Sequence, residues 1–97
     1  MSLSDIYTIA VNLAGPFRLS AVVGERMAAA EGGSIINVSS TASVMPSAAE
    51  VPYACAKAGV NNLTASLART FAPAVRTNCI MPGAFLTDIA DAWGDDI

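Results

Sequence analysis

The segment that decides the fold of this chain is Ser34-Ile35-Ile36-Asn37-Val38. It is short and rich in β-branched residues, and its polarity does not alternate, which is typical of a strand buried on both faces. A second candidate strand runs over residues 75–81. Between them, from about Pro52 to Pro73, apolar residues recur at helical spacing, and proline favours the first turn of a helix. The sequence therefore predicts a strand-helix-strand unit.

The flanking segments complete the order of elements. Residues 3–30 carry apolar side chains at helical spacing, with an interruption at Gly15-Pro16 and a stop at Gly32-Gly33. Residues 39–52 indicate a loop, and residues 82–97 indicate a turn and a tail with one short helix. The order helix-strand-helix-strand predicts one small α/β domain, with a parallel strand pair joined by a right-handed crossover.

Composition indicates a folded chain with more apolar surface than it can hide. Of its 97 residues, 54% are hydrophobic and 13% are charged, which excludes a disordered chain. A monomer of this size buries too little surface to cover so many apolar residues. A two-stranded sheet also leaves both edges open and one layer uncovered. A partner surface, or a missing remainder of the domain, would explain the excess, and the open sheet predicts self-association.

Charge, hydropathy and cysteine content exclude several classes of protein. The net charge is −3 and Lys plus Arg total 5, so nucleic-acid binding is not expected. No apolar run approaches a membrane span, and residues 1–5 do not form a signal peptide. With no histidine and no CxxC pair, Cys55 and Cys79 predict no metal site. Two isolated cysteines in apolar surroundings favour a reducing, cytoplasmic location.

Tyr53 and Lys57 form the most informative polar pair of the chain. They lie four residues apart at the start of the second helix and therefore share one helix face. A lysine charge beside a tyrosine favours the phenolate form, which makes the pair a candidate general acid and base. The alternative is a surface tyrosine that packs on a lysine stem.

Two further positions carry candidate polar groups. Ser40 follows the first strand, 13 residues before Tyr53, where parallel α/β folds gather functional groups. The alternatives are a serine that caps a turn, or Ser39 in its place. Asn12 lies four residues before Pro16, which lacks the N–H that bonds the carbonyl at position i−4. This spacing predicts a kink and a polar site at the Asn12 carbonyl, the alternative being a buried asparagine at a kink.

The segment Asn78-Cys79-Ile80-Met81-Pro82-Gly83-Ala84-Phe85-Leu86-Thr87 turns back across the same edge of the sheet. A glycine lets the backbone approach a flat ligand, and Thr87 offers a hydroxyl. An ordinary turn is the alternative.

These motifs together resemble the short-chain dehydrogenase/reductase family. The matching elements are Asn12 in Val11-Asn12-Leu13-Ala14-Gly15, the run from Gly33 to Ser40, Tyr53-Ala-Cys-Ala-Lys57, and Pro82-Gly83 with Thr87. Their order and spacing fit over nearly the whole chain. The resemblance implies a partial Rossmann fold, that is, a doubly wound parallel sheet, spanning residues 1–97 and lacking the N-terminal cofactor-binding strands.

The resemblance also implies roles for single residues. Tyr53 is implied as the catalytic acid/base, assisted by Lys57, which also binds the nicotinamide ribose. Ser40 is implied to orient the substrate, and the Asn12 carbonyl to hold a water of the proton relay. The remaining cofactor contacts fall on Pro82, Gly83, Phe85 and Thr87, where Phe85 replaces the family's usual branched aliphatic residue. The implied reaction is hydride transfer between NAD or NADP and a small-molecule alcohol/ketone pair.

One departure from the family bears on activity. The glycine-rich turn that binds the cofactor pyrophosphate is not found, because Gly32-Gly33 precedes a strand instead of following one. We therefore expect this chain to be a fragment that, alone, binds the cofactor weakly or not at all and is inactive. The resemblance also implies homo-oligomers through the two long helices.

A non-catalytic, self-associating interaction module is the alternative function. A serine hydrolase is the least favoured of the three functions, since the chain has no GxSxG motif and no histidine. The substrate, its stereochemistry and the choice of NAD or NADP are not predicted.

Overall fold

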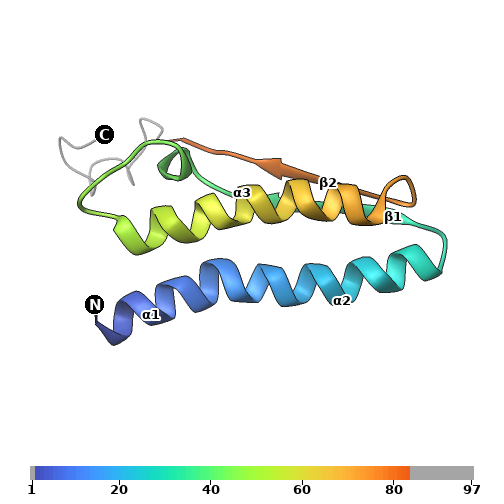
Figure 1. The fold of residues 1–97 in the computed structure, drawn as a ribbon, viewed down its shortest axis with the longest axis horizontal. Helices are drawn as coiled ribbons and strands as arrows, with labels where there is room; N and C mark the ends of the chain where they lie inside the picture. The colour runs from blue at the N-terminus through green and yellow to red at the C-terminus, as the bar shows by residue number, and fades with distance from the viewer. Residues whose placement is uncertain (1, 84–97) are drawn as a thin grey trace, which may run out of the picture.

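Two long helices cover one face of a two-stranded parallel sheet in the computed structural model, which describes residues 2–83 (Figure 1). The first helical run comprises α1 (Leu3–Ile9), a π-helical turn (Ala10–Ala14) and α2 (Gly15–Ala29). It is followed by β1 (Gly33–Val38), a 3₁₀ helix (Thr41–Ser43), α3 (Val51–Phe71) and β2 (Val75–Ile80).

The first run begins at a cap and passes Gly15-Pro16 without a break. The Ser2 side chain accepts from the N–H of Asp5, and the Asp5 carboxylate accepts from the N–H of Ser2, which closes a capping box. Where an interruption is predicted, the backbone forms a π turn, in which the N–H of Gly15 donates to the carbonyl of Ala10. Because Pro16 has no N–H to donate to position i−4, the helix widens locally instead of ending.

The predicted glycine stop after this run is present. Gly32 has φ of +87°, a conformation that side chains disfavour, and its N–H donates to the Met27 carbonyl at 2.8 Å. The chain then reverses direction and enters β1 directly. The glycine pair therefore allows the short turn that joins the end of α2 to β1 (Figure 1).

The two strands pair in parallel, as predicted. Gly33 lies opposite Val75 and Val38 opposite Ile80, with no slip between them. One further bond, from the N–H of Ser39 to the Ile80 carbonyl at 2.8 Å, extends the ladder past the end of β1. Because the strands are parallel, the segments after β1 and β2 emerge at the same edge of the sheet.

The core between sheet and helices is small and partly polar. Among the described residues, the buried hydrophobic side chains are Ala56, Val60, Leu63 and Val75. Asn37, on β1, links both helices, because its side chain accepts from Ser20 of α2 at 3.4 Å and donates to Thr64 of α3 at 3.2 Å. Both helices therefore lie on the same face of the sheet.

The prediction that β1 is buried on both faces is wrong for this chain. Ile36, Val38 and Ile80, which point away from the helices, are 60%, 54% and 55% exposed. The reason is that both helical runs lie on the Asn37 face, and no described element covers the other. The apolar pattern of β1 therefore predicts more burial than residues 2–83 provide.

The expectation that no apolar run approaches a membrane span also needs correction. The run Leu3–Ala29 is 27 residues long, and its most apolar window has a mean hydropathy of 1.4, which meets the length and composition of a span. Only 6% of that window is buried. This is weak evidence for a membrane, since helices that pack against protein have the same composition, but it marks the run as a surface that needs a partner.

Candidate active site

The end of β1 separates two neighbouring serines into different environments. Ser39 is 2% exposed, and its hydroxyl donates to the main-chain carbonyl of Lys57 at 3.2 Å. Ser40 is half-buried and caps the short 3₁₀ helix, where its hydroxyl oxygen accepts from the N–H of Ala42 at 3.2 Å. The Ser39 hydroxyl therefore uses its proton in a hydrogen bond that links the end of β1 to α3. The Ser40 hydroxyl only accepts, so its proton is available for another acceptor.

Tyr53 and Lys57 lie on adjacent turns of α3, and the lysine is fixed in place. Its ammonium donates to the carbonyl of Val38 at 2.9 Å and lies 5.6 Å from the centroid of the Tyr53 ring. Lys57 is only 9% exposed and Tyr53 is half-buried. A buried lysine normally has a specific partner, and here the last carbonyl of β1 serves as one. The pair therefore sits beside the strand end that carries Ser40.

The turn after β2 reaches the same place. The N–H of Thr41, the residue after Ser40, donates to the carbonyl of Pro82 at 3.1 Å. Gly83 is half-buried, and a Cβ atom placed on it would lie 3.3 Å from Cγ2 of Thr41, which is a tight contact. Glycine at 83 therefore lets the segment after β2 run close to the segment after β1. Phe85 and Thr87, also predicted to contact cofactor, lie outside the described residues.

Asn12 lies in the π turn and is half-buried. Its side-chain amide donates to the Thr8 carbonyl at 3.0 Å, a hydrogen bond within the first helical run. The role predicted for Asn12 belongs to its main-chain carbonyl, and the side-chain hydrogen bond does not involve that carbonyl. The structure thus brings Ser40, Tyr53 and Lys57 to the end of β1 and places Asn12 on the neighbouring helix.

Two groups at this site were not identified from the sequence. One is the Val38 carbonyl, a main-chain group that no residue pattern reveals. The other is Asn61, whose amide donates to the Ser43 hydroxyl at 2.8 Å and lies 3.8 Å from the Cys79 sulfur, so that it joins α3, the 3₁₀ helix and β2. The spacing of Asn61, four residues after Lys57 and on the same helix face, was a signal that could have found it.

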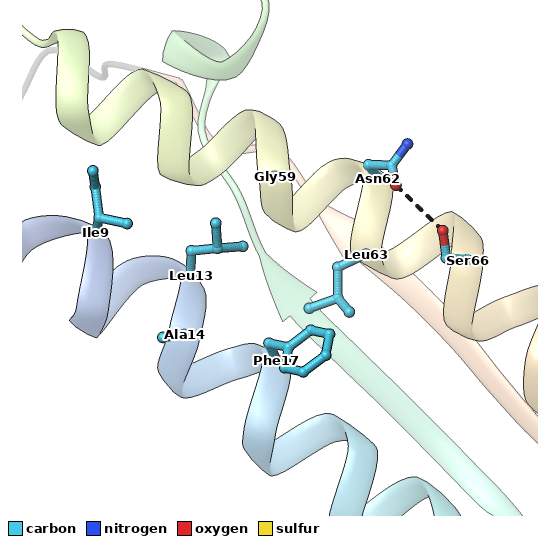
Figure 2. A pocket seen from close by; sticks show the side chains of 8 residues that line it. All are labelled: Ile9, Leu13, Ala14, Phe17, Gly59, Asn62, Leu63 and Ser66. Atoms are coloured by element: carbon cyan, nitrogen blue, oxygen red, sulfur yellow. Dashed lines mark hydrogen bonds between the residues drawn. The ribbon is translucent and has the colours of Figure 1, made fainter.

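Two other features bound what the site can do. Within residues 2–83, no cluster of three or more His, Cys, Asp or Glu side chains could hold a metal ion. One hollow of about 530 Å³ is found away from this site. It lies between the first helical run and α3 (Figure 2), and neither Tyr53 nor Lys57 lines it.

The sequence model of the short chain dehydrogenases matches residues 5–97. The chain belongs to the short-chain dehydrogenase family. The chain is 35% identical over 92 residues to an NAD-dependent glycerol dehydrogenase of Listeria innocua, covering 93% of the chain and 36% of that protein. It is 42% identical over 94 residues to a 3-oxoacyl-[acyl-carrier-protein] reductase of Vibrio cholerae, covering 96% and 38%.

A solved member of the family has the same fold. A gluconate 5-dehydrogenase from Burkholderia cenocepacia, crystallised with NADP and tartrate, superposes with a TM-score of 0.86 at 31% identity, over 99% of this chain and 38% of that one. The predicted family and the partial Rossmann α/β class are therefore confirmed. The chain spans little more than a third of the length of these relatives. NAD or NADP, the predicted cofactor choice, agrees with one relative named NAD-dependent and one structure holding NADP.

Proposed function

We propose that this chain supplies the catalytic half of an oxidoreductase that transfers a hydride between NAD or NADP and an alcohol/ketone pair. The observation that carries the proposal is the fixed ammonium of Lys57, 5.6 Å from the Tyr53 ring and held by the Val38 carbonyl at the strand end that leads into Ser40. A tyrosine, a fixed cation and a free serine proton at one sheet edge form a set suited to moving a proton to or from a substrate oxygen.

The residues present fit the nicotinamide end of the cofactor. Lys57 spends one of its three N–H groups on Val38, which leaves two for ribose hydroxyls. Because Gly83 has no side chain, a flat ring can approach the backbone after β2 at this position. When bound, the cofactor supplies or accepts the hydride. No strand-glycine-turn-helix unit for its pyrophosphate occurs within the 97 residues.

The chemical roles follow from these positions. Tyr53 donates its hydroxyl proton to the substrate oxygen during reduction and accepts it during oxidation. Lys57 stabilises the tyrosinate that results, because opposite charges attract across a partly dehydrated gap. Ser40 donates a hydrogen bond to the same substrate oxygen and so orients it, while keeping its own proton. The carbonyl of Asn12 binds a water through which the proton reaches solvent.

The role of Tyr53 can be tested in a chimera. Residues 5–97 replace the matching segment of the Vibrio cholerae reductase, and the oxidation of NADH and of NADPH is followed by absorbance. Tyr53→Phe removes the exchangeable proton and is expected to lower kcat by about 10²–10⁴-fold. Tyr7→Phe, a change at a 65% exposed tyrosine on α1, is the matched control and is expected to leave kcat unaltered. An undiminished rate in a folded Tyr53→Phe chimera would refute the proposal.

The 97-residue polypeptide alone is expected to be inactive or nearly so. It offers contacts for the nicotinamide end only, so most of the binding energy of a dinucleotide is missing, and with it the positioning of the hydride. Calorimetric titration with NADH and with NADPH is expected to show no binding at micromolar concentrations. Saturation at such concentrations by either cofactor contradicts this expectation.

We also propose that the chain forms homo-oligomers through its two long helices, in a cytoplasmic protein that does not span a membrane. The groove of Figure 2 runs between them and is lined mainly by apolar side chains, from Ile9, Leu13, Ala14 and Phe17 on one side and from Gly59, Asn62, Leu63 and Ser66 on the other. A second copy that covers this groove removes apolar surface from water, which favours association.

The alternative, a non-catalytic self-associating module, is favoured by one observation, the large exposed apolar surface of the first helical run. The chimera separates the two functions. A non-catalytic module in place of the reductase's own segment predicts a folded chimera without activity, whereas the catalytic proposal predicts activity that Tyr53→Phe lowers.

A further inference from the structure

The chain that leads into Ser40 is fastened to α3 by two hydrogen bonds, both at Lys57. The Lys57 ammonium donates to the Val38 carbonyl at 2.9 Å, and the Ser39 hydroxyl donates to the main-chain carbonyl of Lys57 at 3.2 Å. These bonds hold the chain before Ser40. The turn that begins at Ser40 leaves the strand, so a contact of its own is needed to hold it beside the helix.

Asn61 supplies that contact, one helical turn after Lys57. Its side-chain amide donates to the Ser43 hydroxyl at 2.8 Å. The N–H of Ser43 donates to the carbonyl of Ser40 at 2.9 Å, which joins the two ends of the turn. The 3₁₀ helix of this turn packs against α3 (Figure 1). In the described part of the chain, no other hydrogen bond links residues 40–43 to α3.

The amide of Asn61 acts between elements and not within its own helix. Asparagine is a mediocre helix former, yet Asn61 lies in the interior of α3, where it is half-buried. The next residue, Asn62, is exposed, and its amide oxygen accepts from Ser66 of the same helix at 3.3 Å. Of these two neighbouring asparagines, Asn61 is the one that places a second segment of the chain.

We propose that Asn61 is a positioning residue of the reaction, which holds the turn that begins at Ser40 in place relative to Tyr53. The inference deepens the proposed function and rests on it, because Ser40 and Tyr53 must reach the same substrate oxygen. Asn61 acts through Ser43 and touches no reacting atom. A displacement of about 1 Å at a reacting group can cost about 100-fold in rate, so loss of this anchor lowers kcat.

The chimera with the Vibrio cholerae reductase tests this role, with 3-oxoacyl-[acyl-carrier-protein] as the substrate. Asn61→Leu keeps the side-chain volume and removes the hydrogen bond. It is expected to lower kcat by about tenfold with little change in KM, because the substrate still binds but reacts from a poorer geometry. Ser43→Ala removes the same bond from its other end and is expected to match this loss. Ser43→Thr keeps the hydroxyl and is expected to keep the rate.

The matched control is Thr70→Val, which also removes a side-chain hydrogen bond of α3. The Thr70 hydroxyl donates to the Ser66 carbonyl at 2.8 Å, within the helix and away from the Ser40 turn. The control is expected to leave both kcat and KM unaltered.

A double-mutant cycle separates positioning from a general structural role. In a Ser40→Ala chimera there is no Ser40 hydroxyl left to position, so Asn61→Leu is expected to change kcat by less than about twofold. A tenfold loss in both backgrounds would show that Asn61 supports the fold as a whole, and it would overturn the inference. An undiminished kcat in the folded Asn61→Leu chimera would overturn it as well.

A second measurement reports on the turn without relying on activity. Hydrogen exchange of the peptide that contains residues 40–45 is followed by mass spectrometry on the same chimeras. We expect faster exchange in Asn61→Leu and in Ser43→Ala than in the parent, because the turn has lost its bond to α3. Exchange at the parent rate in both variants would overturn the inference.

The outcomes distinguish this inference from the proposed function. A rate that falls in Tyr53→Phe but not in Asn61→Leu refutes the positioning role alone. A folded chimera without activity, or one whose rate is indifferent to Tyr53→Phe, refutes the proposed function and the positioning role with it.

Discussion

At the scale of single residues, two buried threonines of similar exposure have opposite bonding states. Thr64, 7% exposed, donates to the Val60 carbonyl at 2.8 Å and accepts from Asn37 at 3.2 Å. Thr77, 6% exposed and on the helix-facing side of β2, has a hydroxyl that bonds to no described residue. A buried hydroxyl that has lost its water without gaining a partner costs free energy, whereas a paired one does not.

This contrast predicts opposite effects of the same substitution. Thr77→Val replaces the unpaired hydroxyl by a methyl group and is expected to raise the free energy of unfolding by about 1 kcal/mol. Thr64→Val strands the Asn37 amide and is expected to lower it by about 1–3 kcal/mol. Urea denaturation followed by circular dichroism measures both. Destabilisation by Thr77→Val comparable to that of Thr64→Val would show that the Thr77 hydroxyl has a partner.

At the scale of elements, the helices approach each other where a side chain is missing. Gly24 of α2 is buried against the ring of Phe71, at the end of α3, and a Cβ atom placed on Gly24 would lie 2.8 Å from Cζ of that ring. Farther along, a Cβ atom on Gly59 would lie 2.9 Å from both methyl carbons of Leu13. Glycine at these two positions therefore sets the distance between the first helical run and α3.

Adding a methyl group at Gly24 tests this spacing. Gly24→Ala is expected to lower the free energy of unfolding by about 1–3 kcal/mol, because the methyl group overlaps the Phe71 ring. Gly15→Ala is the matched control, since its Cβ atom would meet only the Ala10 carbonyl oxygen at an ordinary 3.6 Å. The control is expected to raise the free energy of unfolding by about 0.5–1 kcal/mol, because alanine loses less backbone conformational entropy than glycine when the helix forms. Equal effects of the two changes would contradict tight packing at Gly24.

At the scale of the whole molecule, apolar surface exceeds what the described fold encloses. The outer face of the sheet exposes Ile36, Val38 and Ile80, and the first helical run exposes large apolar residues along its length, Leu3, Ile6, Tyr7, Val11, Phe17, Leu19 and Val22. Surface of this extent on a small domain marks interaction sites. The groove and the sheet face are separate surfaces, because both helical runs lie on the opposite face of the sheet (Figure 1).

Oligomer formation through the groove is tested at Phe17, which lines it and is 54% exposed. Phe17→Glu places a charge in the proposed interface and is expected to weaken self-association by tenfold or more, because an unpaired charge is costly to bury. Leu19→Glu, at a 67% exposed position that does not line the groove, is the control. Sedimentation velocity over a range of concentrations measures both. A parent chain that sediments as a compact monomer throughout would contradict the proposal.

The local sequence was sufficient for the elements, their order and the family. Apolar periodicity located the helices, Gly32-Gly33 located the stop, and the β-branched run before Ser39 located a strand, because each signal acts within a few residues. The Asn12, Ser40, Tyr53 and Lys57 spacing was sufficient to predict the family, which the comparisons confirm. The catalytic roles of these four residues stay predictions, to be tested at Tyr53.

Tertiary structure alone decided which polar groups meet. The choice of the Val38 carbonyl as the Lys57 partner, the commitment of Ser39 to α3 and the bridging position of Asn61 depend on how α3 crosses the sheet. It also decided that β1 is covered on one face only, which the apolar pattern of the strand does not reveal. The physical reason is range: periodicity and turn chemistry depend on neighbours in the chain, whereas hydrogen-bond partners and burial depend on segments that folding brings together.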